Sequence, residues 1–193
     1  MVSFGLISPR GRATTSQLAA GFRRAALLLS RERGSAVPRS SLFSPAADNT
    51  RAMSQENVEV VSRWFDAAAH EDWVAAEDLF DPDCEIHDFD MPDASGYRGH
   101  GGFFDWIAQW DEAWESWEMT DLEILPLTGE RVIAFFTMYA KGLGSGLELK
   151  RRDAMVYTLS GGKISWLEYY NEQQRHLALE TAGVREEDLK STE

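Results

Sequence analysis

Three stretches in the first half of the chain repeat apolar residues every three or four positions, which is the spacing of one helix face. The first begins at Ser54, a favourable N-cap, and has Gln and Glu in its first turn. The second is short and is stopped by Asp81-Pro82-Asp83, and the third covers 99–117. The three apolar faces are Val58, Val61, Trp64, Phe65 and Ala68, then Trp73, Ala76, Leu79 and Phe80, then Phe103, Ile107, Trp110 and Trp114.

Apolar runs typical of strands dominate the second half of the chain. The predicted strands are 84–87, 119–127, 131–143, 147–159 and 164–171, and the run in 131–143 is apolar enough to be buried on both faces. Ser160-Gly161-Gly162-Lys163 has the composition of a hairpin turn, and 172–182 predicts a last helix with Gly183 as its C-cap. Helices followed by hairpin-linked strands predict an α+β fold with helices packed on one face of an antiparallel sheet.

Charge separates the first 52 residues from the rest. They hold eight arginines against Glu32 and Asp48, a net charge of +6, so residues 53–193 carry −19 of the chain's total of −13. Residues 15–33 could form a basic amphipathic helix. The segment fits an organelle transit peptide, a disordered arm, or a stretch upstream of a start at Met53. We favour the last two, and predict a disordered or non-native extension at 1–52, a domain at 53–183 and a flexible tail at 184–193.

Composition excludes several classes of protein. A domain this acidic repels nucleic-acid phosphates and anionic membranes, and no apolar run approaches the roughly 20 residues that span a bilayer. Cys84 is the only cysteine, so no intrachain disulfide can form, which fits a cytoplasmic protein. The acidic turn after residue 84 does not follow the calcium-loop pattern, because Pro92 takes a ligand position. We predict no metal, no cofactor, no nucleic acid and no membrane partner.

Four short motifs carry a resemblance to a known superfamily. They are Glu56-Asn57-Val58-Glu59-Val60-Val61, Leu79-Phe80-Asp81-Pro82-Asp83, Tyr97-Arg98-Gly99-His100 and Gly161-Gly162-Lys163-Ile164. With the order of elements, they make residues 54–183 resemble the nuclear transport factor 2-like superfamily, in its SnoaL-like branch. The resemblance implies a curved antiparallel sheet forming a cone, three N-terminal helices over it, a deep pocket between them, and a homodimer formed through the sheet. Members include ketosteroid isomerase, limonene epoxide hydrolase, polyketide cyclases and proteins without catalysis.

Asp88 stands where the isomerase-like pattern has its general base, at the end of a strand that precedes the third helix. An apolar surrounding would raise its pKa toward a useful range, and the alternative is a solvated turn. The isomerase also uses a tyrosine on the first helix, which corresponds to Trp64, and a protonated aspartate on a later strand, which corresponds to Ala154. Asp153 is adjacent, but a shift of one residue predicts the other face of the sheet. Steroid isomerisation of the usual kind is therefore not expected.

Glu168 stands where the epoxide-hydrolase strand has an aspartate, so it is the second predicted catalytic residue. That enzyme also needs an Arg-x-Asp pair on a neighbouring strand, but the corresponding stretch 135–139 is uncharged. Arg151-Arg152-Asp153 has the right letters on a different strand. The alternative is a structural ion pair between Glu168 and Arg152.

The aromatic residues define the expected ligand. Trp64, Phe104 and Trp110 are predicted to face the pocket and to favour a small apolar, flat or cyclic molecule, although such a stripe is also typical of a core. His87, Tyr97 and Arg152 complete the predicted binding residues. Two functions stay open: an isomerase, cyclase or hydrolase with Asp88 as base, and a non-catalytic ligand-binding or dimerising module.

Overall fold

The computed structural model describes residues 45–91 and 96–187, with side chains from Met53 onward. The predictions for residues 1–44, including the helix at 15–33, lie outside the described residues. The elements are α2 (Pro45–Ala69), α3 (Trp73–Glu77), β1 (Phe80–Asp88), β2 (Tyr97–Arg98), α4 (Gly99–Ala113), β3 (Trp114–Pro126), β4 (Arg131–Gly142), β5 (Glu148–Ser160), β6 (Lys163–Tyr170), a 3-10 turn η1 (Glu172–Gln174) and α5 (Arg175–Ala182).

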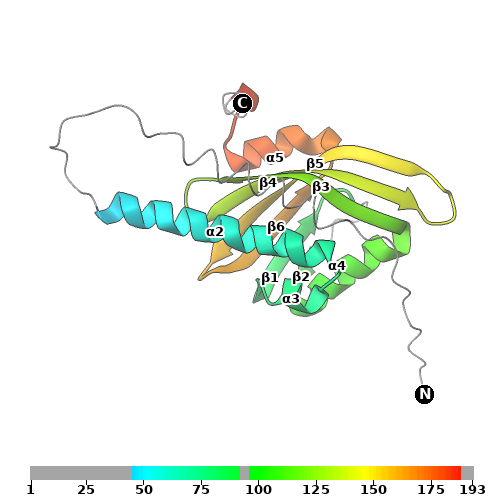
Figure 1. The fold of residues 1–193 in the computed structure, drawn as a ribbon, viewed down its shortest axis with the longest axis horizontal. Coiled ribbons are helices and arrows are strands. Elements are labelled where there is room, and N and C mark those ends of the chain that lie inside the picture. Colours follow the sequence, from blue (N-terminus) through cyan, green and yellow to red (C-terminus); the bar gives the residue numbers. More distant parts are fainter. Residues whose placement is uncertain (1–44, 92–95, 188–193) are drawn as a thin grey trace, which may run out of the picture.

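The six strands form one curved sheet in the order β2-β1-β6-β5-β4-β3 (Figure 1). β3 to β6 are joined by antiparallel pairings, as predicted, but β1 runs parallel to β6. The sheet is therefore mixed rather than antiparallel. The sequence pattern gives no direct sign of this pairing, because β1 and β6 lie far apart in the chain.

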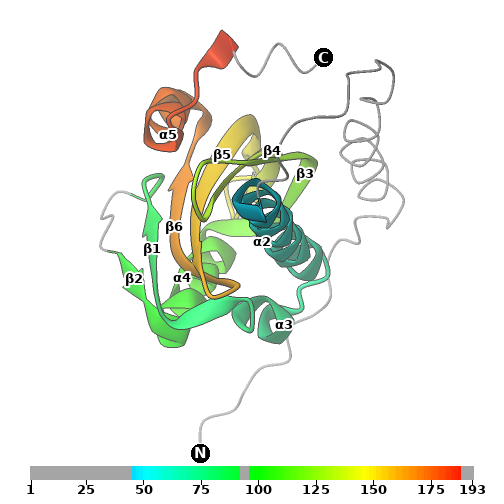
Figure 2. The same cartoon turned by 90° about the vertical axis from the view of Figure 1, so that its left-hand side faces the viewer.

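Helices cover both faces of the sheet. α2 and α4 pack on the concave face, which curves around α2 when viewed along that helix (Figure 2), and this side holds the larger core. α5 packs on the convex face over β4, β5 and β6, in a smaller core with Phe135, Val156 and Leu179. Residues alternate between the two faces along each strand, so the chain position of a strand residue decides which core it joins.

Three predicted boundaries are corrected. The first helix begins at Pro45, which is favourable at a helix start, so Ser54 lies inside α2 and is not its N-cap. Asp81-Pro82-Asp83 lies within β1, at an irregularity between Phe80 and Glu85 where a proline is tolerated. α4 ends at Ala113, because Trp114 takes an extended conformation and begins the edge strand β3.

Two turns follow the sequence prediction. Gly161 and Gly162 both have positive φ, at 57° and 78°, in the hairpin between β5 and β6. Gly183 has a φ of 70° and caps α5.

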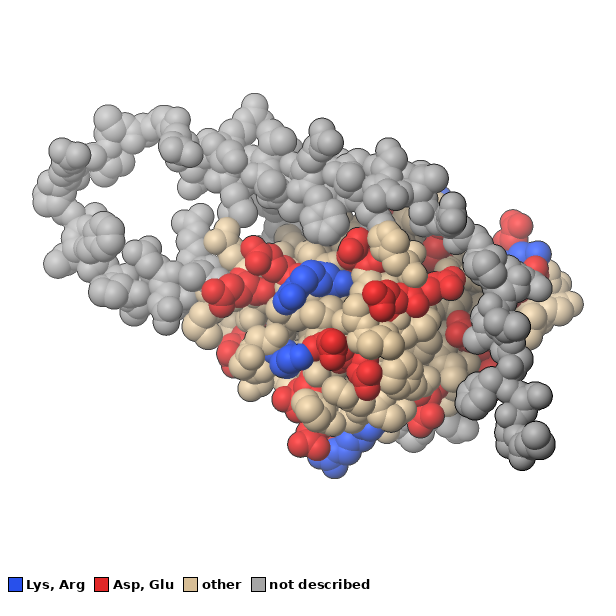
Figure 3. Space-filling model, turned by 60° about the horizontal axis from the view of Figure 1, so that its bottom comes forward, with Lys and Arg blue, Asp and Glu red and all other residues tan. Residues whose placement is uncertain are grey.

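The charged surface side chains reflect the acidic composition of the chain. Acidic side chains outnumber basic ones on the face seen in Figure 3. In the described parts of the chain, no helix is both long enough and apolar enough to cross a membrane.

Candidate functional site

Asp88, the last residue of β1, is buried on the concave side of the sheet beneath α4, with only 1% of its surface exposed. Two indole N–H groups donate to the same carboxylate oxygen, Oδ2: Trp106 Nε1 at 2.8 Å and Trp110 Nε1 at 3.1 Å. The other oxygen, Oδ1, accepts from the backbone N–H of Asp90 at 2.9 Å. Trp106 and Trp110 are one turn apart on the buried face of α4, which is why both reach one atom. Asp88 is thus a held internal carboxylate, and not the residue of a solvated turn.

The surroundings of Asp88 shift its proton affinity. Burial raises the pKa of Asp88 above its ordinary value, because a charged carboxylate is poorly solvated there. The donors Trp106, the Asp90 backbone and Trp110 oppose that rise, and the negative charge of Asp90 adds to it. A carboxylate with a raised pKa is a stronger base than one in water, which suits a group that takes up a proton.

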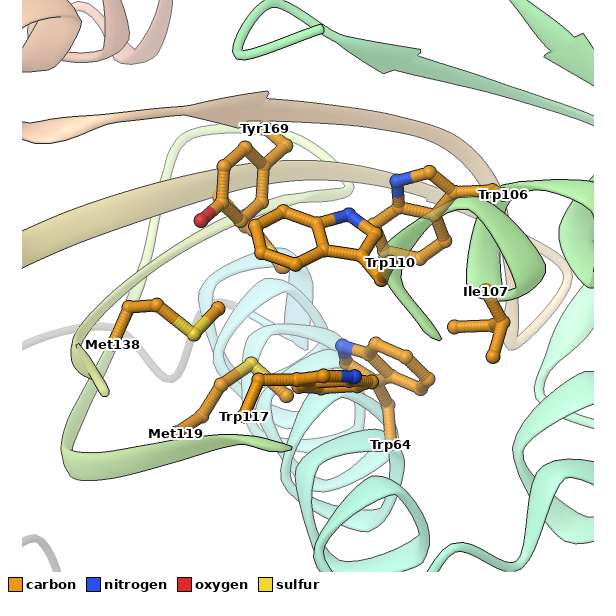
Figure 4. Close-up of a pocket in the computed structure, with 9 residues that line it drawn as sticks. Trp64, Trp106, Ile107, Trp110, Trp117, Met119, Met138 and Tyr169 are labelled. Carbon is orange, nitrogen blue, oxygen red and sulfur yellow. The ribbon is translucent and has the colours of Figure 1, made fainter. Parts of the chain in front are cut away.

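A small apolar cavity adjoins the two indoles that hold Asp88. Its walls are four tryptophans, three methionines, Ile107 and Tyr169 (Figure 4). Trp64, Trp106 and Trp110 are among them. The cavity has a volume of about 10 Å³, roughly the space of one water molecule. The deep pocket implied by the resemblance is therefore nearly filled by the protein's own side chains.

Trp64 lines this cavity and carries an unpaired donor. The side chain is 1% exposed and its Nε1 makes no hydrogen bond. In Figure 4 that nitrogen lies on the edge of the ring turned toward Met138. Burial raises the pKa of Tyr157, and the nearby Trp64 indole opposes that rise. The two side chains do not reach hydrogen-bond geometry. A buried donor without a partner is costly, so an acceptor atom on a ligand would be stabilised there.

A partly buried guanidinium, that of Arg151, lies on the same face of the sheet. Arg151 donates through Nη1 and Nη2 to the two carboxylate oxygens of Asp90, through Nε to Asp153 Oδ2 at 2.8 Å, and through Nη2 to the Tyr169 hydroxyl at 3.2 Å. Tyr169 also donates to Asp153, whose other oxygen accepts from the backbone N–H of Glu172 at 3.0 Å. One arginine therefore balances two carboxylates beside a tyrosine that lines the cavity.

The sequence reasoning missed Trp106, Arg151 and Tyr169. Strand alternation places Arg151, Asp153 and Met155 on one face of β5. It does not show that Tyr169 stands opposite Asp88, because that depends on the parallel pairing of β1 and β6. In the isomerase-like pattern, the aspartate predicted to correspond to Ala154 corresponds better in position to Asp153. Asp153 lies on the cavity side, and Ala154 joins the core under α5.

Glu168 lies on the convex face of the sheet, because it is in register with Val156 of the core beneath α5. It is therefore separated by the sheet from Asp88. β5 is the strand next to β6, so the Arg-x-Asp pair does stand on a neighbouring strand, but its guanidinium meets Asp90 rather than Glu168. Arg152 pairs instead with Glu123, its Nη2 lying 3.4 Å from Oε2.

The other predicted binding residues also lie outside the cavity lining. His87 is in register with Glu168 on the convex face and stacks on Trp166, with 4.3 Å between ring centroids. Tyr97 donates to Gln109 Oε1 at 2.6 Å, and Phe104 is 40% exposed. Of the six predicted ligand contacts, the structure brings together Trp64 and Trp110. In the described residues, no three His, Cys, Asp or Glu side chains are grouped so that they could hold a metal ion.

Comparisons with known proteins agree with this architecture. The profile of the SnoaL-like domain family matches residues 61–167, more than half of the chain. No curated protein matches the sequence significantly.

Similar solved structures include a proposed polyketide cyclase from Xanthomonas campestris, with 16% identity over 65% of this chain and 97% of that chain and a TM-score of 0.56. A nuclear transport factor 2-like protein from Burkholderia xenovorans is 22% identical over 66% and 95%, with a TM-score of 0.53. TerC, co-crystallised with polyporic acid, is 17% identical over 64% and 97%, with a TM-score of 0.55. Identities this low establish the shared fold alone.

Proposed function

The chain belongs to the SnoaL-like domain family, and from that membership and the geometry around Asp88 we propose that it binds a small, flat, apolar molecule and moves a proton on it. Membership of the SnoaL-like family, and a proposed polyketide cyclase with the same fold, support a small-molecule ligand. The proposed site lies between α2, α4 and the concave face of the sheet, with Asp88 as proton acceptor.

One observation carries the proposal: Trp106 and Trp110 line the cavity and also occupy Oδ2 of Asp88. A ligand that displaced either indole would open space and free a lone pair of a buried carboxylate in the same movement. Methionine side chains repack easily, and three of them line the cavity. The TerC structure, which shares the fold, was co-crystallised with polyporic acid, and this supports an organic ligand.

The proposed chemistry uses two groups next to the cavity, namely Asp88, which is bound by two of the lining indoles, and Trp64. Asp88 would take a proton from a carbon beside a carbonyl; the electron pair of that C–H bond would form a C=C bond, and the π pair of the carbonyl would move onto its oxygen. The free N–H of Trp64 would donate to that oxygen. Returning the proton to the same or another carbon completes an exchange or an isomerisation. The ligand class is therefore a flat ketone.

A specific observation favours the non-catalytic alternative. Asp88 already accepts three hydrogen bonds, and the cavity has space for roughly one water molecule. A carboxylate held in this way can serve as a structural anchor for α4. In that case the domain binds a ligand, or packs against a second copy, without turnover.

Proton exchange on 2-tetralone, a flat bicyclic ketone, separates the two functions. In D₂O the wild-type protein is expected to speed deuterium incorporation beside the carbonyl, measured by NMR. Asp88→Asn should lose about 10²–10⁴ of that rate, the range for a general base. Glu168→Gln, a carboxylate change on the convex face, is the control and should keep the full rate. Binding that shifts the Trp64 indole resonance without Asp88-dependent exchange supports the non-catalytic module. No binding contradicts the proposal.

A further inference from the structure

Arg151 contacts two residues that neighbour Asp88, namely Asp90 in the following turn and Tyr169 on the adjacent strand. Its side chain is 15% exposed and lies on β5, two strands away from β1. The guanidinium holds Asp90, two residues after Asp88, and also reaches Tyr169, which pairs with Asp88 across β1 and β6. These contacts give it two independent routes to the site.

The first route passes through the turn that follows β1. Asp90 donates its backbone N–H to Asp88 Oδ1, so the orientation of the Asp90 peptide decides whether that hydrogen bond exists. The Asp90 carboxylate is fixed by the arginine fork and by Asn171 Nδ2, which donates to Oδ1 at 2.8 Å. A forked arginine contact restricts both the position and the rotation of a carboxylate. Arg151 therefore holds the donor that binds one oxygen of Asp88.

The second route passes through the cavity wall. The Tyr169 hydroxyl lies between Arg151 and Asp153, which fixes its ring. Trp110 packs edge-on against that ring, with 5.4 Å between centroids, and donates to the other oxygen of Asp88. A tyrosine free to move would loosen the indole. Both oxygens of Asp88 are thus held by groups that Arg151 supports.

We propose that Arg151 is a positioning residue for Asp88, acting through the Asp90 backbone on one carboxylate oxygen and through Tyr169 and Trp110 on the other. Its part in ligand chemistry rests on the proposed function, but the positioning itself can be measured without a ligand. Loss of Arg151 removes a positive charge and loosens two donors, and each change makes ionisation of Asp88 less favourable.

The other groups around Asp88 do not reverse the expected rise of its pKa on loss of Arg151. Asp90 on the same turn is negative and would lose its partner, and Asp153 on β5 would lose the same partner. Tyr97 on β2 and Tyr169 on β6 have pKa values raised above the ordinary tyrosine range, so both are neutral near pH 7. α4 contributes the uncharged indoles of Trp106 and Trp110.

The test is a pH titration of the Trp106 and Trp110 indole N–H resonances in the full chain, without ligand. In Arg151→Gln the midpoint reporting Asp88 should rise by about one pH unit or more, and the Asp90 amide should lose its hydrogen-bonded shift. Arg152→Gln is the matched control, since the neighbouring arginine lies on the convex face with Glu123. Its midpoint should equal that of the wild type.

Arg151→Lys keeps a positive charge in the site, so it can test the positioning role if Arg151→Gln does not fold. Lysine cannot reproduce the fork, so the midpoint should lie above that of the wild type and the Asp90 amide should still move. Wild-type values for both readouts in Arg151→Lys, or equal changes in Arg152→Gln, would overturn the proposal. If 2-tetralone exchange is absent from the wild type while the Arg151 shifts are present, the proposed function fails and the positioning role stands.

Discussion

At the scale of single residues, Asp88 is the informative group, because its charged form is disfavoured by burial and favoured by three donors. Burial prevails and the pKa is raised, so the folded protein binds this proton more tightly than the unfolded chain. The stability that Asp88 contributes by this route is complete below the ordinary carboxyl pKa. It is lost as pH rises through the higher pKa of the folded state.

Comparison of wild type with Asp88→Asn isolates that contribution. The difference in unfolding free energy should favour the wild type most at low pH and should shrink as pH rises, by about 1.4 kcal/mol for each pH unit between the folded and unfolded pKa. Urea unfolding at a series of pH values measures it. Asp153, whose pKa is also raised by burial, is present in both proteins and cancels. A difference that stays constant with pH contradicts a raised Asp88 pKa.

The resemblance pointed to Asp88 and the helical repeat to Trp64 and Trp110, and the structure brings the three residues close together. The sequence was not sufficient for Arg151 and Tyr169, whose roles depend on which strands are neighbours. Glu168 was predicted to be catalytic by correspondence with other proteins, whereas its pairing with Val156 puts it on the convex face, away from Asp88. Register, rather than residue type, decided which predicted residues share the cavity.

At the scale of elements, local signals predicted most of the helices and strands. The hairpin turn and the cap at Gly183 were found from glycines that need positive φ. The end of α4 was missed because Trp114 and Trp117 continue its apolar spacing while belonging to β3. Both side chains still contact Trp110, so the aromatic spacing in the sequence corresponds to one cluster formed by residues of α4 and β3.

The hairpin between β5 and β6 allows a matched glycine test. Gly162→Ala places a side chain at a φ of 78°, and should cost about 1 kcal/mol of unfolding free energy. Gly101→Ala is the control, since Gly101 is helical in α4 and an added Cβ meets nothing within 4 Å. That variant should gain up to about 1 kcal/mol. Equal effects of the two changes in chemical denaturation would contradict the turn assignment.

At the scale of the whole molecule, the homodimer implied by the resemblance remains a prediction. Sedimentation equilibrium should give twice the chain mass of 21.7 kDa. The net charge of −13 makes two copies repel, so added salt should strengthen the dimer. A single species at the monomer mass across concentration and salt contradicts this expectation. The absence of nucleic-acid binding and a cytoplasmic location also remain predictions.

The parallel pairing of β1 with β6 has a consequence for how the molecule folds. The pairing joins Asp88 to Tyr169, residues separated by most of the described domain. Contacts this distant in sequence are slow to form because a long loop must close first. During synthesis α2, β1 and α4 emerge early, but the strand that pairs with β1 at Asp88 is absent until β6 has been made. The carboxylate, its indoles and its arginine can therefore assemble only after β6 has been made. A chain that stops before residue 170 would contain Asp88, Trp106, Trp110 and Arg151 but would lack the strand that pairs with Asp88.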